Sequence, residues 1–237
     1  MKKILTILFL ASVALWAGTL EQSRQLIVVT TKGWNDNSGT LQRYERASKG
    51  WHKVGKPIPV KLGRNGLGWG IGLHQIPQDA KYIKKEGDGR SPAGIFILKQ
   101  AFGYAPFVVD YPYEVYRATN HCVDDIHSKY YNKIVDSTKI TPDYHSKEQM
   151  KFPKNYYKYG IVVNHNHIDE PGAIPGAGSC IFLHIKKIPT AGCTVMKENE
   201  IKEVIQWLDE RKHPLLLQAP RVEAKILAKG YFSLSLE

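Results

Sequence analysis

The sequence predicts a mainly β fold with one long helix after Cys193 and an inserted lobe at about residues 119–158. Three observations support this prediction: short runs of β-branched or alternating apolar residues, turn clusters that separate them, and one segment with helical spacing. Hydrophobic residues make up 43% of the 237-residue chain, which is enough to build a packed core. We expect residues 18–237 to form a single domain.

Residues 1–17 are typical of an export signal. A basic start that contains Lys2 and Lys3 precedes a mostly apolar run from Ile4 to Trp16, and small residues follow. A membrane span needs about 20 apolar residues, so this run is too short to be one. An uncleaved membrane anchor is the alternative interpretation. We expect a protein of the periplasm or cell envelope, with no membrane segment beyond the signal peptide.

Seven segments carry the pattern of strands or of a helix. Strands are expected over 25–31, 39–46, 51–62, 93–98, 159–163 and 214–218, with turn clusters such as 33–39 and 48–50 between them. Residues 119–158 are polar, rich in Tyr, Lys and Asp, and weakly periodic, which favours an inserted lobe or lid. A helix is expected from about Glu198 to Glu210, because apolar residues recur there at the spacing of one buried face.

Charge and cysteine content restrict the partners. The formal net charge is +11. The export signal and the absence of a nucleic-acid-binding motif argue against a nucleic-acid partner, and a basic surface would favour anionic envelope polymers. Simple solvation by lysines is the alternative. An odd number of cysteines in an exported chain predicts one pair and one free thiol. Cys122 and Cys180 are the natural pair, which leaves Cys193, although three free thiols would also fit.

A thiol and an imidazole lie close together in the sequence. His184 ends an apolar run, and Cys193 follows within the segment Thr190-Ala191-Gly192-Cys193. If the intervening loop doubles back, the imidazole can take the thiol proton while the sulfur attacks a carbonyl. Gly192 lacks a side chain, so a carbonyl can approach its backbone N–H, which becomes a candidate oxyanion donor. From this spacing alone, two core residues are the more common arrangement.

An ordered set of motifs resembles the L,D-transpeptidases of the YkuD type. The run from Gly178 to Val195 is similar to their catalytic segment, in which a His precedes a Gly-Cys pair. Similar stretches are Glu86-Gly87-Asp88-Gly89-Arg90-Ser91-Pro92-Ala93-Gly94-Ile95-Phe96, Cys122-Val123-Asp124-Asp125, Tyr131-Asn132 and Trp207-Leu208, so the resemblance covers most of residues 60–210. It departs from the common pattern after Cys193, where Thr194, Val195 and Met196 stand in place of a small residue and Arg.

The resemblance implies a mixed β-sandwich or barrel-like catalytic domain that acts on peptidoglycan stem peptides. Cys193 would attack the diamino acid carbonyl of a stem tetrapeptide and expel D-alanine, and a second stem or water would resolve the acyl-enzyme. His184 would act as general base and acid. We expect no metal and no organic cofactor. Contacts to substrate are expected from four residues: Arg90, Asn166, Ser179 and Thr190.

Several alternatives stay open. An L,D-carboxypeptidase or endopeptidase would use the same pair with water, and a peptidoglycan-binding protein would need neither group. The run His165-Asn166-His167-Ile168-Asp169 echoes a zinc-ligand pattern of metallo-β-lactamase-like hydrolases, but its surroundings do not fit, so a polar loop is the preferred interpretation. Asp124 and Asp125 are expected to anchor the lobe. The sequence makes no prediction of the oligomeric state.

Overall fold

The computed structural model describes residues 18–151 and 153–237, so the expected export signal lies outside the described residues. The helices are α2 (Glu198–Trp207), α3 (Arg221–Phe232) and the short 3-10 helix η1 (Glu210–Lys212). The strands, in chain order, are β1 (Gln25–Thr31), β2 (Ser38–Ala47), β3 (Gly50–Lys61), β4 (Leu67–Trp69), β5 (Ser91–Gly103), β6 (Tyr113–Val115), β7 (Asn120–Val123), β8 (Ile134–Asp136), β9 (Lys147–Gln149), β10 (Tyr159–Val163), β11 (Phe182–Ile185), β12 (Thr194–Met196) and β13 (Leu215–Pro220).

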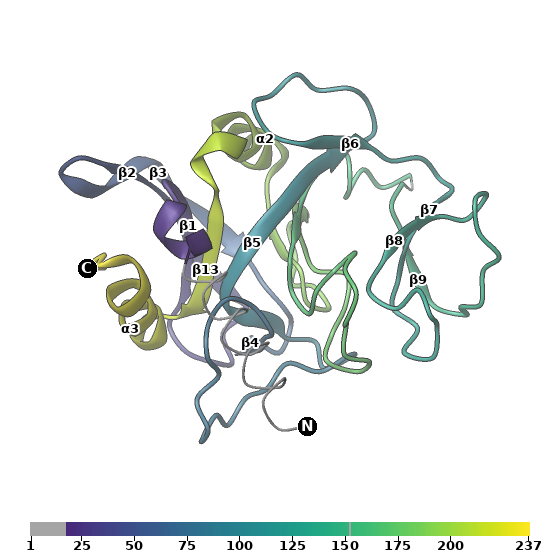
Figure 1. The fold of residues 1–237 in the computed structure, drawn as a ribbon, viewed down its shortest axis with the longest axis horizontal. Helices are drawn as coiled ribbons and strands as arrows, with labels where there is room; N and C mark the ends of the chain where they lie inside the picture. Colours follow the sequence, from purple (N-terminus) through teal and green to yellow (C-terminus); the bar gives the residue numbers. More distant parts are fainter. Residues whose placement is uncertain (1–17, 152) are drawn as a thin grey trace, which may run out of the picture.

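Eight strands close into a barrel in the order β10-β11-β12-β3-β2-β1-β13-β5, because β5 also pairs with β10. The pairs β1–β13 and β11–β12 are parallel, and the other neighbours in the barrel are antiparallel. The short strands β4 and β6 add to β5 outside the closed ring. The long β5 crosses the molecule in Figure 1 and links both ends of the barrel. The prediction of a mainly β fold is therefore confirmed.

The strand predictions follow the observed strands closely where the residues are β-branched or apolar. Both β1 and β10 have the expected bounds, and β2, β3 and β13 differ from expectation by one or two residues at an end. The strand β5 is longer than the expected 93–98, because its first two residues pair with β4 and its last residues pair with β10 and β6.

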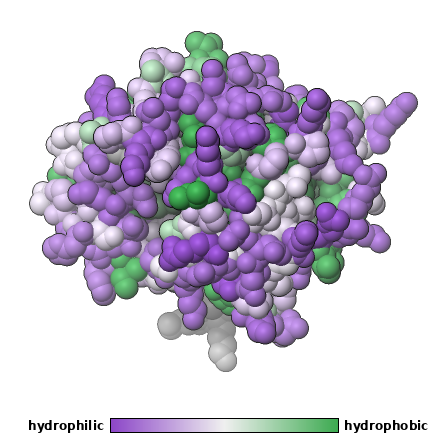
Figure 2. Space-filling view, turned by 180° about the vertical axis from the view of Figure 1, so that it is seen from behind, coloured by the Kyte–Doolittle hydropathy of each residue, from purple (hydrophilic) through white to green (hydrophobic). Residues whose placement is uncertain are grey.

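The core lies inside the barrel and beneath the two helices. The strands β1 and β13 are buried along almost their whole length, which agrees with their continuous apolar runs. Their outer face is covered by α3, whose buried residues Ala224, Leu227, Ala228 and Phe232 recur at helical spacing. The helix α2 packs on β10 and β11. The face of the molecule in Figure 2 is mostly hydrophilic, with separate hydrophobic patches.

The helix predictions were wrong in two respects. The helix after Cys193 ends at Trp207 rather than Glu210, because Asp209 accepts from the Arg211 N–H and begins the separate turn η1. The helix α3 was not expected. The buried face of α3 consists partly of alanines, which give a weak hydrophobic signal. The exposed Val222 and Ile226 on another face obscure the helical spacing of the apolar residues. Within the described residues, no helix combines the length and the apolar character needed to cross a membrane.

Residues 119–158 contain a second sheet, in the order β8-β7-β9, which lies beside the barrel (Figure 1). A disulfide joins Cys122 of this sheet to Cys180, just before β11, and Cys193 is the free cysteine. The predicted pairing is therefore confirmed. Through this bond the second sheet is fixed to the segment that leads into β11 and His184.

Removal of the disulfide should destabilise the protein substantially. It closes a loop with a sequence separation of 58 residues. Chain-entropy arguments then give a loss of about 4 kcal/mol in the free energy of unfolding for the Cys122→Ala/Cys180→Ala variant. Urea unfolding followed by fluorescence measures this value. The matched control is Cys193→Ala, which keeps the bond. Equal stability of the double variant and the wild type would contradict the prediction.

Candidate functional site

The turn that carries Cys193 is attached to the end of β3. The Thr190 N–H donates to the Leu62 carbonyl, and the Arg64 N–H donates to the Thr190 carbonyl, both at 2.9 Å. The Thr190 hydroxyl then closes the turn: it donates to the Cys193 carbonyl at 2.5 Å and accepts from the Gly192 N–H at 3.1 Å. The segment between β11 and β12 is thereby held in a fixed shape, with Cys193 directly before β12.

The Cys193 thiol is nearly enclosed, since only 8% of the residue is exposed. Its Sγ accepts from the Phe182 N–H at 3.3 Å and donates to the Cys180 carbonyl at 3.4 Å. Burial raises the pKa of this thiol to about 12. At neutral pH the group is therefore a protonated thiol rather than a thiolate.

His184 lies on β11 beside this turn. The parallel register of β11 and β12 sets His184 opposite Val195 and so brings the imidazole next to the Cys193 segment. Its Nδ1 lies 3.2 Å from the carbonyl oxygens of Tyr156 and Ile185. Carbonyl oxygens only accept, so Nδ1 carries the proton and Nε2 keeps its lone pair. Burial lowers the pKa of His184 to about 4, so the imidazole is neutral at pH 7.

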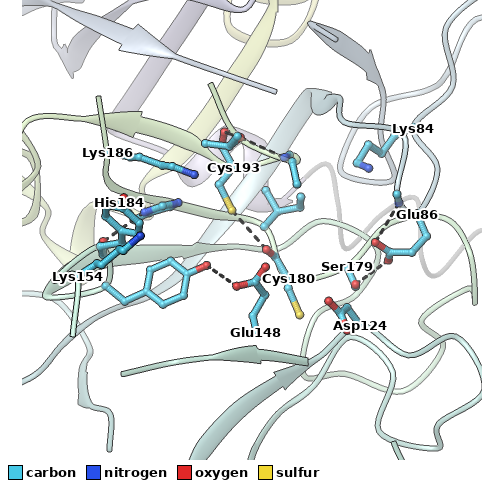
Figure 3. A pocket seen from close by; sticks show the side chains of 17 residues that line it. Lys84, Glu86, Asp124, Glu148, Lys154, Ser179, Cys180, His184, Lys186 and Cys193 are labelled. Carbon is cyan, nitrogen blue, oxygen red and sulfur yellow. Dashed lines mark hydrogen bonds between the residues drawn. The ribbon is translucent and has the colours of Figure 1, made fainter. Parts of the chain in front are cut away.

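Both groups line one cavity of about 400 Å³ (Figure 3). The arrangement pairs an uncharged thiol with an uncharged imidazole whose free nitrogen is Nε2. In such a pair the imidazole can accept the thiol proton as the sulfur forms a bond to carbon. The two residues that sequence reasoning singled out first therefore line the same cavity. At rest they are not an ion pair, and the thiol donates to the Cys180 carbonyl.

The second sheet supplies part of the cavity wall. Asp124 and Glu148 line it from the side of residues 119–158. Tyr157 contacts both Glu148 and His184. The Tyr157 hydroxyl donates to a Glu148 oxygen at 3.2 Å, and its ring meets the His184 ring edge-on at 4.8 Å between centroids. Burial raises the pKa of Glu148, and the charge of Asp124 raises it further. Sequence reasoning missed Tyr157 and Glu148, because they come from a polar segment without a recognisable motif.

Positive side chains line the same cavity. Lys154 and Lys186 lie on the side of His184 in Figure 3. Lys84 lies at the opposite end, where its Nζ is paired with Asp88 at 2.7 Å. The cavity therefore separates lysines near His184 from carboxylates along the wall of the second sheet.

Of the predicted substrate contacts, Ser179 and Thr190 line the cavity. The Ser179 hydroxyl donates to Glu86 at 2.6 Å. Gly192 also lines the cavity, but its N–H is bound to the Thr190 hydroxyl. The expectation of a free oxyanion donor at Gly192 therefore does not match this structure, since that N–H must leave Thr190 before it can serve a substrate oxygen.

Arg90 and Asn166 lie outside this cavity, contrary to expectation. The Arg90 guanidinium donates to the Trp34 and Leu67 carbonyls and to the Asn35 amide oxygen, and it lies over the Tyr82 ring. Asn166 is fully buried, where its amide holds the backbone of Ile174 and Gly178. Each polar group is occupied in fixing a loop, so neither is available to bind a substrate in the cavity.

The histidine pair at 165 and 167 does not converge on a common point. His165 is buried, with Nδ1 accepting from the Ile71 N–H at 3.2 Å and Nε2 bound to the Ala177 carbonyl at 3.0 Å. The His167 imidazole instead lies 3.9 Å from Glu170. Across 18–151 and 153–237, no three His, Cys, Asp or Glu side chains are grouped as metal ligands.

Asp125 caps the lobe backbone by accepting from the His127 and His145 N–H groups, as expected.

Comparison with known proteins gives one structural likeness. No protein-family model matches the chain, and no curated protein sequence is similar to it. The structure is similar to that of Bd1075 from Bdellovibrio bacteriovorus, with 14% sequence identity and a TM-score of 0.40. The alignment covers 88% of this chain and 54% of that chain, so this chain spans about half the length of Bd1075.

Stability should fall in mild acid. Burial lowers the pKa of His74 and His184 to about 4 and that of His165 to about 3. The unfolded chain takes up these protons near pH 6.5, so it binds more protons than the folded chain as the pH falls from there to about 4. Each histidine should then cost on the order of 2 kcal/mol at pH 4.5. Urea unfolding at pH 7 and pH 4.5 measures the loss, and an unchanged midpoint would contradict it.

Proposed function

We propose that this chain is an exported cysteine acyltransferase of the L,D-transpeptidase type that acts on peptidoglycan stem tetrapeptides. The observation that carries the proposal is the free Cys193 thiol and the His184 imidazole, with Nε2 unprotonated, at one cavity. The motif resemblance along residues 60–210 supplies the substrate class. The disulfide supports a location outside the cytoplasm, because such bonds persist in oxidising compartments.

In the first half-reaction, the Cys193 sulfur attacks the diamino acid carbonyl while its proton passes to Nε2 of His184. The carbonyl π electrons move onto oxygen. As the tetrahedral species collapses, the C–N bond to D-alanine breaks, and the imidazolium returns the proton to the leaving amine. A thioester on Cys193 and free D-alanine result. The hydrogen bonds from Nδ1 to the Tyr156 and Ile185 carbonyls stabilise the transient imidazolium and hold the ring in one orientation.

In the second half-reaction, the side-chain amine of another stem attacks the thioester carbonyl. Nε2 takes a proton from this amine, the C–S bond breaks, and the thiol is regenerated. Water in place of the amine gives hydrolysis, and hence trimming. The enclosed neutral thiol limits unproductive reactions, because attack needs the proton acceptor and the substrate in place together.

Lysines near His184 suit an anionic acyl donor. The terminal D-alanine of a tetrapeptide carries a carboxylate, and Lys154 and Lys186 line the cavity on the His184 side. Their charges favour a substrate that ends in this group over one that continues as a peptide.

The products formed from purified disaccharide-tetrapeptide test the function. Wild-type protein should convert it to cross-linked dimers with release of D-alanine, and Cys193→Ala should form neither dimer nor tripeptide. Mass spectrometry detects both the dimer and the tripeptide. Tripeptide without dimers from the wild type would assign hydrolysis in place of transpeptidation. An unchanged substrate with both proteins would contradict the proposal.

Replacement of the proposed base should separate folding from turnover. His184→Gln keeps a polar side chain of similar reach but cannot accept the thiol proton, so turnover should fall by about 10²–10⁴-fold. D-alanine release measures turnover, and circular dichroism checks the fold. Undiminished turnover in folded His184→Gln would remove His184 from the mechanism.

A further inference from the structure

Two carboxylates of the second sheet face the reactive groups across the cavity. Glu148 on β9 and Asp124 next to β7 line the cavity that also holds Cys193 and His184 (Figure 3). The disulfide between Cys122 and Cys180 fixes this sheet to the segment before β11, so the carboxylates are attached close to the nucleophile. Their position is therefore set by the covalent structure of the site.

No salt bridge within the described residues involves either carboxylate, although the charge of Lys186 offsets part of the rise in the pKa of Glu148. The Asp124 Oδ1 atom is buried and has no hydrogen-bond partner in the described part of the chain. Glu148 accepts through one oxygen from the Tyr157 hydroxyl, which is uncharged. The nearby Lys84 is already paired with Asp88.

Two carboxylates without a salt-bridge partner in a partly enclosed cavity are unfavourable unless a cation binds them. Loss of water from an unpaired polar group costs on the order of 1–3 kcal/mol, and more for a charged one. Burial and the neighbouring Asp124 raise the pKa of Glu148, which is the expected effect of two like charges that share one wall. A cationic group placed between them would relieve this repulsion and donate two charge-assisted hydrogen bonds, one to each carboxylate.

The carboxylate wall and the His184 imidazole share one cavity. His184 is only 4% exposed, and its imidazole points into the same cavity. A ligand that meets the Glu148 and Asp124 wall is therefore adjacent to the groups that carry out the chemistry. A substrate group held at this wall would therefore lie within a few bonds of the attacked carbonyl.

We propose that Glu148 and Asp124 form a subsite for the side-chain ammonium group of the diamino acid whose carbonyl Cys193 attacks. This inference rests on the proposed function, which makes that residue the acyl donor. The ammonium donates hydrogen bonds to the Glu148 oxygen that the Tyr157 hydroxyl does not bind and to the Asp124 carboxylate. A stem whose side-chain amine is already in a cross-link is an uncharged amide and lacks this interaction. The subsite therefore selects uncross-linked stems as acyl donors.

The test compares two tetrapeptides, one with the free side-chain amine and one with that amine acetylated. Single-turnover acylation is measured, because the acetylated stem cannot act as the acceptor. With wild-type protein in excess, the second-order rate constant for D-alanine release should be tenfold or more higher for the free amine. In Glu148→Gln and Asp124→Asn this preference should shrink to less than threefold, through loss of activity on the free amine alone. Glutamine at 148 can still accept from the Tyr157 hydroxyl, so the wall keeps its shape.

The control is Glu114→Gln, which removes an exposed carboxylate of β6 outside the cavity and should keep the full preference. Equal activity of the wild type on both peptides, or an undiminished preference in both wall variants, would overturn the subsite. If no peptide is turned over, calorimetric binding to Cys193→Ala decides separately. Tighter binding of the free amine, lost in Cys193→Ala/Asp124→Asn, would support the subsite while the proposed function fails. Equal binding of the two peptides would overturn the subsite.

Discussion

The parallel pairing of β11 with β12 is the constraint on which the candidate site depends. Parallel neighbours cannot be joined by a tight hairpin, so residues 186–193 must travel to the end of β3 and return before β12 begins. Thr190 anchors the far point of that path, and its hydroxyl fixes the last turn. Cys193 is thereby set at the start of one strand and His184 in the middle of its neighbour. Barrel closure through β5 and β10 keeps β11 in register.

Burial of both reactive groups determines the resting state of the site. An enclosed thiol and an enclosed imidazole each favour the uncharged form, so the low-dielectric surroundings suppress charge separation before substrate arrives. A substrate that brings its own charges changes this balance. The lysines and carboxylates on separate walls provide opposite potentials only a short distance apart. The electrostatic field at the Cys193 thiol therefore depends on the charges of the bound ligand as well as on those of the protein.

Sequence-based predictions were most accurate for segments whose local hydrophobic pattern matches their burial in the folded protein. The apolar runs of β1 and β10 are strands because barrel and helices bury both of their faces, and the cysteine parity predicted the observed disulfide. The helix α3 was missed because small residues form its buried stripe. The predicted residues around His184 and Cys193 line one cavity, because the strands that carry them are neighbours in the barrel. The place of Glu148 in the cavity could not be predicted, because it depends on how the second sheet packs against the barrel. The loop contacts of Arg90 are likewise set by tertiary structure.

The spacing of the three cysteines has a consequence for how the oxidised protein is made. Cys180 is much closer along the chain to Cys193 than to Cys122. Shorter loops close with a smaller loss of entropy. In a complete unfolded chain, the incorrect bond between Cys180 and Cys193 therefore forms faster than the native one. A chain that emerges from its N-terminus meets the cysteines in a different order. Cys122 and Cys180 are then both exposed before Cys193 arrives. Synthesis from the N-terminus thus favours the bond between Cys122 and Cys180 and leaves Cys193 as a free thiol. Oxidative refolding of denatured protein should need thiol–disulfide exchange to reach the same pairing.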